Sequence, residues 1–296
     1  MKSIFYHTKS ALKKINPIIY IIFLFLVYNC SSHKLVKEST KDNAEYFFLQ
    51  KEELARGPYH TSHSKIFGKY VEGYNDFILK AIDKIQATAM DGGGYFTGIT
   101  AEPPESPIGY ELKLMGKSLL NPPRKTSYCS GASYAAFIEG LNLILGDNPS
   151  GELDYPHYEA LRMQEEDGSR RNDGIKYWGQ WNSDGFGSHF ALVQYSGMGR
   201  EIKPENLRPG DFVNISWKSG LGHSVIFLGW FIDKAGKKYM VYWSSQKSTK
   251  GMADQKVHVN RIKEIKGVRL TNPDKIFDFN IENKVNSDIP GDKIRF

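Results

Sequence analysis

Cysteine is nearly absent from this chain, which has only Cys30 and Cys129 among its 296 residues. Two cysteines form at most one disulfide, so a scaffold held together by several disulfides is excluded. The chain also lacks the HExxH sequence and the paired Cys/His spacings of zinc sites. Its glycine-rich segment at 92–98, GGGYFTG, lacks the lysine of a phosphate-binding loop. We therefore expect no metal or other cofactor.

A strong excess of charge is missing as well. The formal net charge is +6, but four of the basic residues lie at the extreme N-terminus, before residue 15. Without them 35 basic and 33 acidic residues remain, a net charge near +2. Nucleic-acid binding needs a clustered basic face, and we expect none here.

The chain has one purely apolar run of note, IIYIIFLFLVY at residues 18–28. It is shorter than the roughly 20 residues of a membrane span and follows a basic segment, as in a signal peptide. The run ends at Cys30, which resembles a bacterial lipoprotein signal, although Asn29 stands where a small residue is usual. The resemblance implies cleavage before Cys30 and a lipid on its thiol. The alternative is an uncleaved membrane anchor with an incidental cysteine. Both predict an exported, membrane-anchored protein, periplasmic or on the cell surface.

Composition divides the rest of the chain. We expect a signal peptide at 1–29, a polar tether at 30–55, and one α+β domain at 56–296 with an insertion at about 147–203. Apolar spacing predicts a helix within 70–90, which DGGG at 91–94 ends. A second helix is expected at 128–145, capped by Thr126 or Ser127. Strands are predicted at 189–195, 211–217, 223–230 and 239–245, with one more from Val257.

The segment SYCSGASYAAF, residues 127–137, places Cys129 at the start of the second predicted helix. If Cys30 carries lipid, Cys129 has no disulfide partner, and a lone thiol in an exported protein is either inert packing or functional. A helix N-terminus favours the thiolate that a nucleophile requires. The backbone N–H of Cys129 or Ser130 can donate to an oxyanion.

A cysteine nucleophile needs a histidine as its base. Of the eight histidines, His189 and His223 lie at predicted strand starts, and local pattern alone does not separate them.

Three motifs occur in a fixed order: YCSG at 128–131, LRPGD at 207–211 and GHSVIFLG at 222–229. This order resembles the NlpC/P60 superfamily of papain-like cysteine peptidases and its CHAP-type amidase relatives. The resemblance implies a nucleophile helix packed on an antiparallel sheet, with Cys129 as nucleophile. It also implies that the base follows the PGD strand, which selects His223 over His189. Tyr128 departs from the family, which has aspartate before the cysteine.

In that family a polar residue on the strand after the histidine strand orients the imidazole. Alternation places Tyr242, Ser244 and Gln246 on one face of this strand. The Gln246 amide oxygen can accept from the imidazole, and Ser244 is a weaker alternative. The alternative is that SSQ, residues 244–246, only begins the loop before Gly251 and has no role at the site. Accessory or oxyanion roles fall to Ser130, Ser244 or an upstream tyrosine, Tyr110 or Tyr95.

The resemblance implies a membrane-tethered cysteine hydrolase that cleaves amide or peptide bonds, in peptidoglycan, through a thioester. Two alternatives stay open: a lipoprotein with a degenerate site that acts as a binding module, and an acyltransferase on the same scaffold. The expected partners are peptidoglycan or a peptide substrate, and a membrane through the N-terminal lipid.

Overall fold

The computed structural model describes residues 46–97, 108–120, 125–146, 151–163, 165, 171, 174–179 and 188–296. The predicted signal peptide, Cys30 and most of the predicted tether lie outside these residues. None of the helices formed by the described residues is long and apolar enough to cross a membrane.

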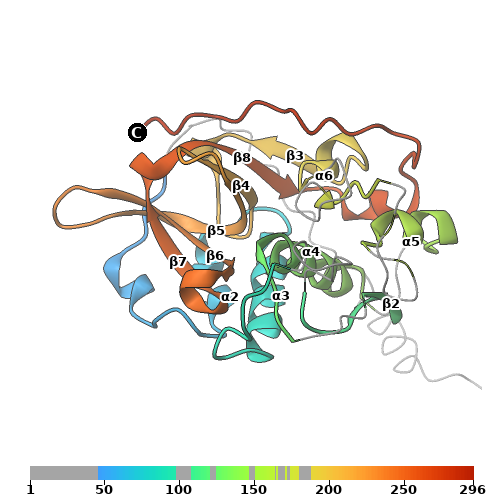
Figure 1. Ribbon diagram of the computed structural model, residues 1–296, viewed down its shortest axis with the longest axis horizontal. Helices are drawn as coiled ribbons and strands as arrows, with labels where there is room; N and C mark the ends of the chain where they lie inside the picture. Colours follow the sequence, from blue (N-terminus) through green and yellow to red (C-terminus); the bar gives the residue numbers. More distant parts are fainter. Residues whose placement is uncertain are drawn as a thin grey trace, which may run out of the picture. The chain divides into compact units, whose positions relative to one another are not determined.

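A six-stranded antiparallel sheet organises the domain (Figure 1), in the order β3-β8-β4-β5-β6-β7. Its strands are β3 (Gly199–Ile202), β4 (Phe212–Trp217), β5 (Gly222–Ile232), β6 (Lys238–Gln246), β7 (Gly251–His258) and β8 (Ile262–Leu270). A separate hairpin pairs β1 (Leu112–Leu114) with β2 (Lys117–Leu120). The predicted α+β class with an antiparallel sheet is confirmed. The strands predicted at 211–217, 223–230 and 239–245 are confirmed as β4, β5 and β6.

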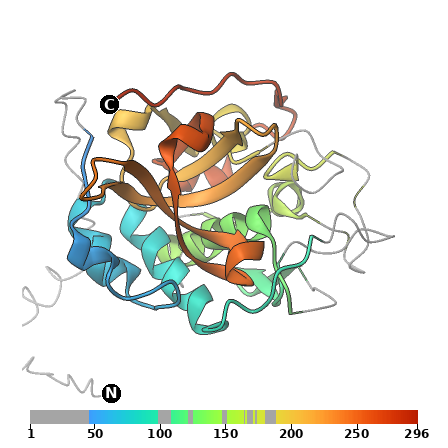
Figure 2. The ribbon, with the colours of Figure 1, turned by 60° about the vertical axis from the view of Figure 1, so that its left-hand side comes forward.

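Helices α3 and α4 pack against each other and against one face of the sheet (Figure 2). The α-helices are α2 (His63–Phe67), α3 (Asn75–Ala87), α4 (Cys129–Leu145), α5 (Tyr155–Leu161) and α6 (Ala191–Gln194). Short 3-10 turns are η1 (Lys51–Leu54), η2 (Gly68–Tyr70), η5 (Pro204–Asn206), η6 (Lys247–Thr249), η7 (Val259–Arg261) and η8 (Pro273–Phe277). A Cβ on Gly140 of α4 would lie 2.4 Å from the Ile78 side chain, so this glycine lets α3 approach.

Strand β5 is buried on both faces, which explains its continuous apolar sequence. Ile226 and Leu228 join the core beneath α3 and α4. Val225 and Phe227 point to the opposite face and join a second core that Trp230 also enters. By the same alternation, the His223 side chain lies on the face of Val225 and Phe227, and the Ser224 side chain lies on the face of Ile226 and Leu228.

Four predictions of local structure are wrong. No separate strand begins at Val257, because β7 ends at His258 and η7 follows. Residues 189–195 do not form a strand, because the Tyr195 N–H bonds the Ala191 carbonyl and the segment turns into α6. Neither Thr126 nor Ser127 caps α4; its N-cap is Tyr128, which makes no side-chain cap bond. The tether ends before Tyr46, because the Leu49 N–H bonds the Trp230 carbonyl at 2.7 Å and the Leu49 side chain is buried.

The predicted insertion at 147–203 is also too long, because its last residues form a strand of the main sheet. Strand β3 pairs with β8 along four residues, from Gly199↔Leu270 to Ile202↔Gly267. Residues 199–202 therefore belong to the sheet and not to an insertion.

The LRPGD motif joins α3 to the sheet through a buried charge. Gly210 has a φ of +92°, and a Cβ there would lie 2.8 Å from the Asn75 backbone, so glycine is required. The fully buried Asp211 accepts hydrogen bonds from Asn75 Nδ2 and from Arg269 Nε and Nη2, at 2.7–2.8 Å. The motif thereby fixes the start of β4 against α3 and β8.

Candidate active site

Cys129 is the first residue of α4, as the sequence predicts, and its side chain is half-buried. Burial raises the pKa of the Cys129 thiol, and hydrogen bonds from the backbone N–H groups of Ser224, Ser130 and Cys129 offset this only in part. The sulfur is therefore a neutral thiol near pH 7. It lies beside the N–H groups of the first helical turn, which have no carbonyl partner within the helix and also suit a developing oxyanion.

The N-terminus of α4 is held where β5 and β6 separate. The ladder between these strands begins at Ile226↔Trp243, and beyond it serine side chains make the contacts. Ser244 Oγ donates to the Ser224 carbonyl at 2.7 Å, and Ser127 Oγ donates to Ser245 Oγ at 2.8 Å. The Ser224 N–H is thus positioned to meet the Cys129 sulfur.

His223 and Gln246 meet as predicted, with 3.4 Å between imidazole Nε2 and amide Oε1. The Gln246 amide is oriented because its nitrogen donates to Thr249 Oγ1 at 2.6 Å and to the Ala253 carbonyl, which can only accept. Its oxygen therefore faces the imidazole and fixes the proton on Nε2. This leaves Nδ1 as the basic nitrogen of His223.

The surroundings keep His223 neutral. Burial lowers the pKa of His223 to about 4, and the hydrogen bond to Gln246 raises it only slightly. Trp217 stacks on the ring with 6.2 Å between centroids, and Tyr242 meets it edge-on at 5.6 Å. A neutral imidazole with a fixed tautomer is suited to accept a proton.

Cys129 and His223 have two neighbours in common, Ser224 and Tyr242. Ser224, which bonds the sulfur, follows His223 in the chain. Tyr242, which contacts the His223 ring, also interacts electrostatically with Cys129; burial first, and then Cys129, raise the pKa of Tyr242. In the described part of the chain no hydrogen bond joins the Cys129 sulfur to the imidazole.

The predicted accessory residues divide between the site and the core. Ser130 is buried directly after the nucleophile, and Ser244 positions the Ser224 carbonyl rather than the imidazole. Tyr110 is not at the site: its hydroxyl faces Glu139, about 15 Å along α4 from Cys129. Burial, and then Glu139, raise the pKa of Tyr110 well above its usual value. Tyr95 pairs with Ser127 by a backbone bridge.

His189 is unsuited to be the base. It is fully buried, and its Nε2 donates to the Lys266 carbonyl at 2.9 Å. Burial lowers the pKa of His189 to about 3, and the hydrogen bond to the Lys266 carbonyl offsets this only in part.

Two contributors to the site were not predicted. The Ser224 N–H has no signature in a sequence because every residue but proline carries one. Trp178 donates from Nε1 to Ser224 Oγ at 3.2 Å and packs on Tyr134, Phe137 and Phe212. Trp178 is thus a core residue, and the other aromatic residues of the glycine-rich segment 178–187, Trp181 and Phe186, lie outside the described residues.

A second polar cluster joins the start of α2 to α3 and β7. His60, His63 and Asp254 each bring a possible metal ligand within 4.8 Å of the others. Both nitrogens of His63 face carboxylates, however: Nδ1 faces Asp83 at 2.7 Å and Nε2 faces Asp254 at 2.9 Å. His60 Nδ1 accepts from the Ser62 N–H, so its Nε2 carries the proton toward Asp254. A doubly protonated His63 satisfies every one of these bonds, and we interpret the cluster as an ion-pair network.

This cluster predicts loss of stability in alkali. Burial alone would lower the pKa of His63, but Asp254 and then Asp83 raise it from 6.5 to about 9. The charged form therefore stabilises the fold fully below about pH 6.5, and this contribution, about 3 kcal/mol, is lost as pH rises through 9. We expect the melting temperature to fall by roughly 6–12 °C between pH 7 and 10.

Thermal unfolding of His63→Gln checks the origin of that fall. The variant should have a lower melting temperature at pH 7 and a smaller fall of the melting temperature between pH 7 and 10. His258→Gln should show the same fall as the parent protein. An equal fall of the melting temperature in His63→Gln and in the parent protein would contradict the assignment of this fall to His63.

No protein-family model, curated protein or solved structure matches this chain.

Proposed function

We propose that this protein is a papain-like cysteine hydrolase of amide bonds, tethered to a membrane through lipid on Cys30 and directed at peptidoglycan. One observation carries the chemistry: the Gln246 bond leaves His223 Nδ1 as a neutral base, one residue from the N–H that holds the Cys129 sulfur. The peptidoglycan substrate and the compartment are supported by the N-terminal sequence and by the order of the three motifs.

Hydrolysis would begin with a neutral pair. As the Cys129 sulfur attacks the carbonyl carbon, His223 Nδ1 takes the thiol proton, so the two events are coupled. The oxyanion is stabilised by N–H groups at the start of α4. His223 then gives the proton to the leaving amine, and a thioester remains. Water attacks the thioester with His223 again as base, which releases the acid and restores the thiol.

Release of soluble peptides from purified peptidoglycan tests this proposal. The intact protein should release fragments that carry new amino groups, and Cys129→Ala should release none. Cys30→Ser, which removes the other cysteine and with it the lipid, should retain the activity on purified peptidoglycan. Release that persists in Cys129→Ala would contradict a role for this thiol.

The neutral thiol and the missing hydrogen bond between Cys129 and His223 favour one alternative, a binding module with a degenerate site. A module of this kind would sediment with peptidoglycan and release no fragments, with or without Cys129. An acyltransferase would use the same pair but pass the acyl group to an amine, so an added amine would appear in the product.

A further inference from the structure

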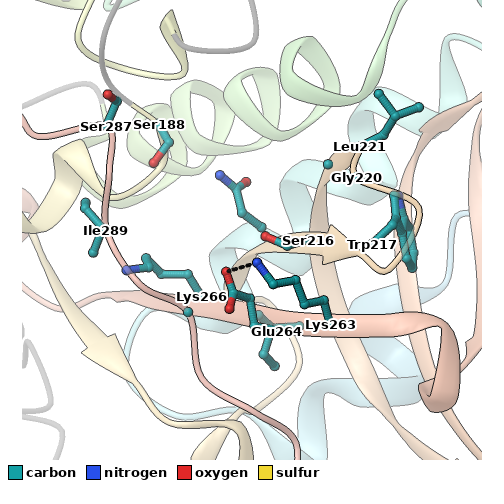
Figure 3. A pocket seen from close by; sticks show the side chains of 14 residues that line it. Ser188, Ser216, Trp217, Gly220, Leu221, Lys263, Glu264, Lys266, Ser287 and Ile289 are labelled. Atoms are coloured by element: carbon teal, nitrogen blue, oxygen red, sulfur yellow. Dashed lines mark ion pairs between the residues drawn. The ribbon is translucent and has the colours of Figure 1, made fainter.

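A cavity of about 280 Å³ lies on the sheet and is lined by residues of β4, β8 and the C-terminal segment (Figure 3). Asn214 and Ser216 of β4 and Glu264 and Lys266 of β8 line it, and Trp217 stands at its rim. The cavity uses none of the groups that carry the proposed proton transfer.

The register of the sheet places this cavity relative to the sulfur. Asn214 lies directly opposite Ser224 on β5 and directly opposite Lys266 on β8. Directly opposed residues share one face, so the three side chains form a row across the sheet. The Ser224 N–H bonds the Cys129 sulfur, and Lys266 lies two strand spacings away, roughly 10 Å. In an extended peptide roughly 10 Å is the length of about three residues.

Lys266 is an unusual cation. Its side chain is 93% buried, its ammonium donates to the Pro290 carbonyl and lies 4.8 Å from the centre of the Phe190 ring. Among the described residues no carboxylate lies within 4 Å of it. Glu264, which borders the same cavity, pairs with Lys263 at 3.9 Å instead (Figure 3). Glu201, Asp292 and Glu264 act on this cation only from a distance. A buried cation with no carboxylate in contact is costly, and an anion in the cavity would lower that cost.

Asn214 adds a second buried polar group without a partner among the described residues. Its Oδ1 is buried and makes no hydrogen bond with any described residue. A carbonyl oxygen accepts only, so this atom suits an N–H donor. The cavity thus offers an acceptor next to the site and a cation one strand further on.

We propose that this cavity is a substrate subsite for an acidic peptide, in which Lys266 pairs with a carboxylate and Asn214 Oδ1 accepts a backbone N–H. The subsite rests on the proposed function, because it deepens the substrate class of the same hydrolase. It selects peptides that carry a carboxylate within about three residues of the scissile bond.

Peptide binding to the full-length Cys129→Ala chain, which cannot cleave the peptide, tests the subsite. The probes are the tetrapeptide Ala-Glu-Lys-Ala, acetylated at its N-terminus and amidated at its C-terminus so that Glu carries the only carboxylate, and its glutamine counterpart with the same blocked ends, measured by calorimetry. We expect the acidic peptide to bind at least about tenfold more tightly, as for a charge-assisted bond that forms in a partly buried site. Adding Lys266→Met should bring the ratio of the two affinities close to one. Lys275→Met, which removes a surface lysine paired with Asp278, should leave the ratio unchanged.

Several outcomes would overturn the subsite: equal affinities in the Cys129→Ala chain, no binding of either peptide, or a ratio that Lys266→Met does not alter. Asn214→Ala supplies a second variant if Lys266→Met unfolds; it should weaken both peptides alike and preserve the ratio. Peptidoglycan release is measured in parallel with the active chain. If Cys129 is needed for fragment release but the two peptides bind equally, only the subsite is contradicted. If the acidic peptide binds more tightly but no fragments are released, only the hydrolase proposal is contradicted.

Discussion

Replacing His223 by alanine is expected to lower kcat/KM for amide hydrolysis by about 10²–10⁴-fold. The reason is the neutral state of Cys129: burial raises its pKa, so few molecules hold a thiolate near pH 7. Without a base the thiol must lose its proton unaided before it attacks. Initial rates on a soluble amide substrate, with folding checked by circular dichroism, measure the loss. A loss of less than tenfold would contradict the assignment of His223 as base.

Variants at Gln246 separate orientation from structure. Gln246→Glu places a carboxylate beside the imidazole, which favours the charged ring and raises the pKa of His223 from about 4. Because the base must be neutral, the acid limb of the profile of kcat/KM against pH should move to higher pH. Gln255→Glu makes the same change on β7, beside Tyr242 but away from the ring, and should leave the limb in place. An unmoved limb in Gln246→Glu would show that Gln246 does not orient His223.

The sequence was sufficient where periodicity and motif order agreed. Burial on both faces gives β5 its unbroken apolar run, and small residues at its start mark α4, so both elements were predicted near their observed bounds. Gln246 was predicted from the family resemblance, which points to a polar residue on this strand, and from alternation, which places Tyr242, Ser244 and Gln246 on one face.

Other features depend on contacts that no local pattern records. The segment 189–195 has strand-like apolar residues, yet Ala191, Leu192 and Tyr195 are buried on one side of a helical turn. The pairing of His63 with Asp254 joins residues 191 positions apart. The row from Ser224 to Lys266 appears only once the order β5-β4-β8 is known. Long-range register, rather than composition, therefore sets the surroundings of the candidate site.

Removing the Asp211 carboxylate by Asp211→Ala is expected to lower the free energy of unfolding by about 3–5 kcal/mol, since it leaves the Arg269 guanidinium buried without this partner. Arg269 is 2% exposed and would keep only Glu72 and the Asn206 carbonyl. Urea unfolding measures the change. Asp278→Ala, which breaks an exposed pair with Lys275, should cost less than about 1 kcal/mol.

The double variant Asp211→Ala, Arg269→Leu removes both charges and should recover part of the loss, since no unpaired ion then remains buried. An equal or larger loss in the double variant would show that packing, not the unpaired charge, dominates. Asp211 fixes only the start of β4, and the pairs from Phe212↔Ile226 to Ser216↔Gly222 hold the His223 strand beyond it. The folded fraction of Asp211→Ala at low urea should therefore retain Cys129-dependent turnover per folded molecule. Turnover that falls further than the folded fraction would mean that the LRPGD motif also positions His223, and not only the start of β4.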